Sequence, residues 1–361
     1  MAKDSNHHFR PISQGSKALG PKDFLVGDLY HRSFVSVIRE KLANSHDDRG
    51  FHYDPFKLFW QPPGTEDDIR VHGEMYTSPA FLEAHRELQE SPGEPGCNFP
   101  RVVVAMMFWS DITHLTSFGN AKLWPTYLCF GNESKYRRCK PNCHLCNHVA
   151  YFQVVSCLLF LPFIPFSDNS LQLPDSFKDF ASKHMGSKRP SNSFMPHCRC
   201  ESLHAQWDIL LDEEFLVAYQ HGIVIECCDG VTRRFYPRIL TYSADYKEKH
   251  AGFICCFTTD FLTNLCRIII ASIRDLGSCP CPRCLIPFSL VPDMGTANDM
   301  KLRKSLARVD NEERRHKVQM ARQLIYNKRY VVNSKVVEGI LKKESLVPTT
   351  VSCALAEADK N

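Results

Sequence analysis

The order of the expected elements predicts a mixed α/β fold. An apolar run at 101–109 is typical of a buried strand, a helical period follows at 206–219, and further strands extend to 244. Because strands lie on both sides of this helix in the sequence, we expect a mixed sheet with flanking helices. The chain has 361 residues, 43% of them hydrophobic and 23% charged, which is enough for a large core.

The N-terminal third is expected to contribute little to that core. Residues 1–50 are polar and mixed, and we predict a disordered tail there. A region of loops and one helix follows at 51–100. Ser78 is a suitable cap for this helix and Pro79 suits its first turn. The turn-rich linker SPGEPGCNFP ends the region.

The main domain is predicted over 101–290. After its first strand, LWPTYLCF at 123–130 indicates a second one. The helix at 206–219 is expected to stop near Gly222. Beyond it, Cys228-Asp229-Gly230 predicts a hairpin between strands at 223–227 and 232–236, and one more short strand covers 238–244. A basic helical region is expected over 291–361.

Two segments of the main domain fit badly. Residues 154–172 show no period of a strand or helix, and their residue types are those of pyrimidine-rich codons. Residues 250–267 interrupt an otherwise coherent passage, and their end could be encoded by a splice acceptor. We hypothesise that both are translated introns. The alternative is two genuine hydrophobic loops.

Composition and cysteine usage narrow the class of protein. The net charge of +4 is too small to indicate a partner by itself. The chain has 17 cysteines but a polar N-terminus without a secretory signal, so we expect an intracellular protein with reduced thiols or metal ligands rather than disulfides. No apolar run is long enough for a transmembrane helix, and we predict no membrane partner.

Two acids follow predicted strands. Asp111 comes after the strand at 101–109, and Asp245 comes after the strand at 238–244. Paired carboxylates at strand ends suit a two-metal Mg²⁺ site, in which the ions activate a water or a 3′-hydroxyl during phosphoryl transfer. The alternative is that each Asp is only a turn residue or a helix cap.

Several ordered blocks resemble the fungal Plavaka-type DNA transposases, which are related to the CACTA group. The blocks are SDITHLTSFGNAKLWPTYLCFGNESKYRRCKP, LLDEEFLVAYQHGIVIECCDGVTRRFYPRILTYSADY, LGSCPCPRCLIP and ARVDNEERR, with FHYDPFKLFW and RVHGEMYTSPAFLEAHRELQESPGEPGC upstream. The resemblance implies an RNase H-like fold with a DDE-type acid triad, which cleaves DNA and transfers strands at transposon ends. It assigns the first acid to Asp111 and the second to Asp245.

The sequence departs from that family in two places. Lys247 stands where the family typically has proline after the second acid, and no segment matches the one that carries the third acid. We therefore expect the N-terminal part of a transposase, with an incomplete RNase H-like domain and without activity. The alternatives are a non-catalytic nucleic-acid-binding module, and a decayed gene product. If the protein is functional, the resemblance implies a nuclear location.

A cysteine knuckle, Cys279-Pro-Cys281-Pro-Arg-Cys284, offers a zinc half-site in Cys281 and Cys284. Two other groups offer ligands to complete it: Cys139, Cys143, Cys146 and His148, or His197, Cys198 and Cys200. The alternative is buried reduced thiols without a metal.

DNA contacts are expected from basic residues. The segment 301–330 holds ten Lys or Arg against three acids and predicts a basic helix that includes Arg314 and Arg315, with Leu302, Leu306, Val309 and Leu324 turned inward. Arg137, Arg138 and Lys140 extend this positive surface. A solvated helix face is the alternative. The sequence leaves the oligomeric state and the target DNA open.

Overall fold

The computed structural model describes residues 2–9, 24–44, 50–115, 122–153, 173, 175–184, 194–243, 277–281, 284–309 and 311–348. Its strands are β1 (Ala2–Phe9), β2 (Phe24–His31), β3 (Leu58–Trp60), β4 (Ile69–Val71), β5 (Arg101–Ser110), β6 (Thr113–His114), β7 (Lys122–Phe130), β8 (Asn147–Phe152), β9 (Ile223–Glu226) and β10 (Thr232–Ser243). Both segments hypothesised to be introns, 154–172 and 250–267, lie outside the described residues.

The longer helices are α1 (Phe34–Ala43), α3 (Pro79–Glu90), α5 (Asp175–His184), α6 (Phe194–Leu210), α7 (Glu213–His221), α9 (Ala297–Ser305), α10 (Glu312–Arg322) and α11 (Lys335–Leu341). Shorter helical turns are η1 (Met75–Thr77), α4 (Lys135–Arg138), η2 (Pro141–Cys143), η5 (Phe288–Asp293), η6 (Gln323–Asn327) and η7 (Lys342–Glu344). None of the helices in the described part of the chain combines the length and the apolar character that crossing a bilayer requires.

The strands build one large mixed sheet. Among the described residues it has eight strands in the order β1-β2-β8-β7-β5-β10-β9, with β6 paired to β7, while β3 and β4 form a separate hairpin. β5 lies antiparallel to β7 and parallel to β10. A mixed sheet with flanking helices is the predicted α/β class, which is confirmed.

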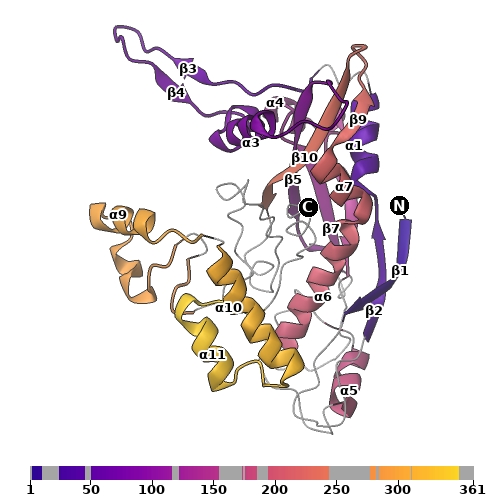
Figure 1. Ribbon diagram of the computed structural model, residues 1–361, viewed down its shortest axis with the longest axis vertical. Coiled ribbons are helices and arrows are strands. Elements are labelled where there is room, and N and C mark those ends of the chain that lie inside the picture. The colour runs from indigo at the N-terminus through magenta and orange to yellow at the C-terminus, as the bar shows by residue number, and fades with distance from the viewer. Residues whose placement is uncertain are drawn as a thin grey trace.

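The two faces of the sheet are covered by different helices. Along β5, Val102, Val104, Met106 and Phe108 point to one side because side chains alternate along a strand. On that side Phe108 packs at 5.1 Å from Phe34 of α1 and 5.5 Å from Trp207 of α6, measured between ring centroids. Val103 and Ala105 face the other side, beneath α3. Figure 1 shows α3 with the β3–β4 hairpin at one end of the molecule, and α10 and α11 at the other.

Residues 24–43 differ from the predicted polar tail, because they form β2 and α1. Leu29 and Phe34 are fully buried, and the Ser33 hydroxyl caps α1 by accepting a bond from the amide of Ser36. The buried positions of α1 recur at helical spacing, so the amphipathic signal was present but was masked by its polar neighbours. The large core therefore begins well before residue 101.

The predicted helix at 206–219 is two helices. The first ends at Leu210, and Asp212 caps the second, because its carboxylate accepts a 2.8 Å bond from the Phe215 amide. The predicted hairpin is confirmed as β9 and β10, which pair antiparallel. β10 is one continuous strand through Pro237, where two strands were expected.

The basic segment 301–330 is also divided, between α9 and α10. Val309 was expected to turn inward, but it is exposed, and Arg308 is buried instead. The Arg308 guanidinium donates to the carbonyl oxygens of Cys279, Cys281, Cys284 and Glu344 at 2.8–3.1 Å. These four carbonyls accept hydrogen bonds from the buried guanidinium. Through Arg308, the cysteine knuckle is joined to η7.

Candidate active site and DNA-binding residues

Asp111 follows β5 directly and is exposed. β10 runs parallel beside β5, so both strands present their carboxyl ends at the same edge of the sheet. The register pairs Tyr242 with Phe108 and Ser243 with Trp109. Asp245, the second predicted acid, lies outside the described residues, two positions beyond Ser243 in the sequence.

A hydrogen bond ties these two strand ends together. The side chains of Ser110 and Tyr242 bond to each other, and Ser110 is only 5% exposed. Tyr242 also packs edge-on against Trp207 of α6, with ring centroids 5.9 Å apart. Contacts with β10 and, through Tyr242, with α6 therefore fix the backbone that precedes Asp111.

Aromatic side chains lie in a row across the strands beside Asp111. Trp109 lies 4.9 Å from Tyr127 on β7, and Tyr127 lies 4.4 Å from His148 on β8, between ring centroids. Burial raises the pKa of Tyr127, and the negative charges of Cys146, Tyr151 and Asp111 add to that effect. Asp111 is thus close enough to Tyr127 to affect its ionisation.

Two polar residues that sequence reasoning missed follow β7, just as Asp111 follows β5. Asn132 is fully buried and accepts a 2.8 Å bond from the Ala105 amide, while its amide group donates at 2.9 Å to the carbonyls of Val103 and His52. Asn132 therefore joins β5 to the segment at residue 52. The sequence signal for both residues was the polar pair Asn132-Glu133, which comes just after the apolar strand β7.

Glu133, also fully buried, forms the centre of an ion-pair cluster. Its carboxylate lies 2.8 Å from the ammonium of Lys41 on α1 and 2.7 Å from the guanidinium of Arg137 on α4. Lys41 is itself buried. A carboxylate enclosed with two cations in this way holds α1 and α4 against the end of β7.

The residues predicted to bind DNA differ in how they are placed. Lys140 is exposed. Arg137 pairs with Glu133, and Arg138 is mostly buried, 3.8 Å from the Glu74 carboxylate. Arg314 is buried and Arg315 is half-buried on α10. Of these five, Lys140 is the one most open to a phosphate.

Cys281 and Cys284 lie together, and their side chains share a hydrogen bond. The Arg303 guanidinium lies 3.9 Å from the Cys281 sulfur and 3.7 Å from the Cys284 sulfur, and Asp299 holds it at 2.7 Å. In the part of the chain that the structure describes, no three Cys, His, Asp or Glu side chains are grouped for metal binding. The expected completing ligands therefore do not join this pair there.

His197, Cys198 and Cys200 are buried in α6. His197 Nε2 lies 3.0 Å from the Tyr326 hydroxyl, and Glu201 forms a 2.6 Å ion pair with Arg322 of α10. Burial lowers the pKa of His197 to about 4. Burial alone would raise the pKa of Glu201, but Arg322 and His197 hold it below its usual value. This cluster packs α6 against α10.

The lowered pKa of His197 predicts how stability depends on pH. The unfolded chain takes up a proton on His197 near pH 6.5, whereas the folded protein does so only near pH 4. The free energy of unfolding should therefore fall by as much as about 3 kcal/mol as the pH drops through this window. His197→Gln should flatten the profile, measured by urea unfolding at several pH values. His316→Gln, the same change at an exposed histidine, is the control and should leave the dependence of stability on pH unchanged.

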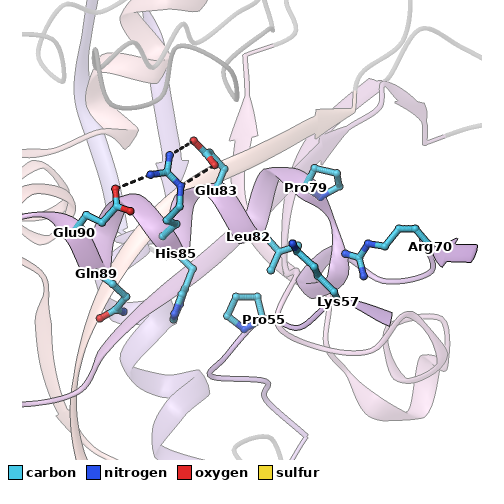
Figure 2. Close-up of a pocket in the computed structure, with 10 residues that line it drawn as sticks. Pro55, Lys57, Arg70, Pro79, Leu82, Glu83, His85, Gln89 and Glu90 are labelled. Carbon is cyan, nitrogen blue, oxygen red and sulfur yellow. Dashed lines mark hydrogen bonds and ion pairs between the residues drawn. The ribbon is translucent and has the colours of Figure 1, made fainter. Parts of the chain in front are cut away.

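A cavity of about 630 Å³ lies between α3 and the base of the β3–β4 hairpin. Arg86 lines this cavity and forms ion pairs with Glu83 and Glu90. Figure 2 shows Lys57 and Arg70 on the side of the hairpin. None of the predicted site residues lines this cavity. The carboxyl ends of β5 and β10 therefore remain the candidate active site.

Comparison with known proteins finds a family match for part of the chain. The family model described as Plavaka transposase matches residues 23–160. This segment is similar to the Plavaka transposases. No curated protein and no solved structure matches the chain. The resemblance read from the sequence is confirmed over the Plavaka segment, which contains β2, α1 and β3 to β8 with Asp111. Asp245 and the cysteine knuckle lie beyond it.

Proposed function

We propose that this chain is a DNA-binding transposase core in which Asp111 and Asp245 hold Mg²⁺. The Plavaka match supports a transposase, and transposases act on DNA. One observation carries the placement of the metal: β5 and β10 are adjacent and parallel, so the residues that follow them emerge at one edge of the sheet. Carboxylate oxygens are the ligands that Mg²⁺ prefers.

The residues around Asp111 would position it for that role. The hydrogen bond between Ser110 and Tyr242 holds the strand ends together, and the exposure of Asp111 leaves its carboxylate accessible to an ion. Bound Mg²⁺ would activate a water or a 3′-hydroxyl for attack on a phosphodiester. Lys247 near the second acid would weaken ion binding, because like charges repel.

We expect this segment to bind DNA and metal, and the family resemblance implies that cleavage also needs a third acid beside Asp111 and Asp245. Action on chromosomal DNA would place the protein in the nucleus. Zinc at Cys281 and Cys284 stays a prediction that this function does not require.

DNA binding is tested by charge reversal at the exposed Lys140. Lys140→Glu should weaken binding to a random-sequence duplex, and it should reduce the slope of log affinity against log salt by about one, because one phosphate contact is lost. Fluorescence anisotropy over a salt series measures both quantities. Lys183→Glu, on the exposed side of α5, is the matched control. Affinity that is independent of salt would contradict the proposal, and equal effects of the two variants would reject Lys140 as a contact.

A further inference from the structure

Two cysteines lie next to each other at the end of the β7–β8 ladder, Cys129 within β7 and Cys146 directly before β8. Leu128 of β7 pairs with Asn147 of β8, and Cys129 and Cys146 are the next residues in this antiparallel register. Their side chains share a hydrogen bond, and neither cysteine belongs to a disulfide. The fold thus brings together two thiols that are 17 positions apart in the sequence.

This placement suits a disulfide. Directly opposed residues of an antiparallel pair have Cα atoms about 4.5–5.5 Å apart, and disulfides join Cα atoms about 4.4–6.8 Å apart. Because the two thiols already contact each other, closing the bond requires side-chain rotation rather than movement of the strands. The ladder between β7 and β8 ends at the pair next to such a bridge, so the two chain segments are held together there.

The two thiols are chemically unequal. The hydrogen bond from Cys129 lowers the pKa of Cys146 to about 7, against the opposing effect of burial, and a bond to the Trp109 side chain lowers it further. The same thiol–thiol bond, together with burial, raises the pKa of Cys129. Cys146 is therefore the better nucleophile, while Cys129 retains its proton beside it.

We propose that Cys129 and Cys146 form a two-cysteine oxidation site that reacts with a hydroperoxide and closes a disulfide between β7 and β8. The Cys146 thiolate attacks the peroxide, so an S–O bond forms, the O–O bond breaks and hydroxide or alkoxide leaves. The Cys129 sulfur then attacks the resulting sulfenic acid, an S–S bond forms, and the Cys129 proton leaves with the hydroxyl group as water. The two thiols lose two electrons, and the peroxide gains them.

Other cysteines of the described chain are less suited to this reaction. Cys198 and Cys200 are buried in α6, and burial raises the pKa of each. Cys139 and Cys143 lie within a few residues of Cys146 in the sequence but are not its partners in the register. They serve as matched controls. The site does not depend on the proposed metal chemistry.

The test treats the full chain with hydrogen peroxide, blocks the remaining thiols with N-ethylmaleimide and identifies cross-linked peptides by mass spectrometry. We expect a Cys129–Cys146 link that dithiothreitol reverses, which is lost in Cys129→Ser and in Cys146→Ser and kept in Cys139→Ser and Cys143→Ser. Oxidation should also quench tryptophan fluorescence, and Trp109→Phe should remove that change because its ring bonds to Cys146.

A second measurement keeps the test decisive if a variant folds poorly. In Cys129→Ser the sulfenic acid has no resolving thiol, so dimedone should label Cys146 in a protein whose circular dichroism matches the parent. A link from Cys129 to another cysteine, or an absence of dimedone label at Cys146, would overturn the proposal. So would release of stoichiometric zinc when the pair is alkylated, because the thiols would then be metal ligands.

Discussion

Replacing Glu133 with glutamine is expected to lower the free energy of unfolding by about 3–5 kcal/mol. The Glu133 carboxylate is fully buried between Lys41 and Arg137, at 2.8 and 2.7 Å. Glutamine has nearly the same shape but no charge, so Lys41 would remain buried without its counter-charge. Urea unfolding followed by circular dichroism measures the loss.

Glu40→Gln is the matched control, since Glu40 pairs with Arg32 at the surface and its side chain is 66% exposed. An exposed ion pair contributes less than about 1 kcal/mol, so this change should have little effect on the urea midpoint. Equal destabilisation by the two variants would show that the cluster around Glu133 is not sequestered from water. A loss confined to Glu133→Gln would support its role in holding α1 and α4 against β7.

Replacing Asp111 with asparagine is expected to weaken divalent-ion binding by more than about tenfold. Loss of a residue that merely supports a metal ligand typically costs about 10–100-fold in affinity, and loss of a ligand should cost at least as much. Mn²⁺, which can replace Mg²⁺ and is detected by electron paramagnetic resonance, provides the measurement. Asp245→Asn should have a similar effect if both acids share the ion.

Asp179→Asn, an exposed position on α5, controls for general loss of surface charge. Unchanged Mn²⁺ affinity in both Asp111→Asn and Asp245→Asn would exclude the proposed metal site. If Asp111→Asn alone loses Mn²⁺ binding, Asp111 would remain a metal ligand and Asp245 would be excluded as one. Nicking of DNA that requires Mg²⁺ and disappears with Asp111→Asn would correct the expectation of inactivity drawn from the sequence.

Local patterns of the sequence were sufficient for several elements. The apolar run of β5, the Ser78 cap and Pro79 of α3, and the Asp-Gly turn between β9 and β10 all appear as predicted. Each depends on a few adjacent residues whose conformational preference is strong. The acid after β5 could be identified for the same reason, because a carboxylate that follows a buried strand stands out from its neighbours.

Predictions that depended on burial were less successful. Val309 was assigned to an inward face, but the structure exposes it and buries the neighbouring Arg308 instead. Carbonyl oxygens from the cysteine knuckle and from η7 make it possible to bury the arginine. Those oxygens come from distant parts of the chain, so no local period could reveal them. The same holds for Arg314, which was expected at a DNA surface and is buried in α10.

The sequence by itself determined the mixed α/β class, the Plavaka resemblance over its N-terminal blocks and the position of Asp111 at a strand end. Only the tertiary structure decided that β5 and β10 are adjacent and parallel, that Glu133 is enclosed by Lys41 and Arg137, and that the thiols of Cys129 and Cys146 meet. Hydrophobic period and turn preference act over a few residues. Strand pairing and ion-pair burial join residues far apart in the chain, and which of them meet depends on how the whole core packs.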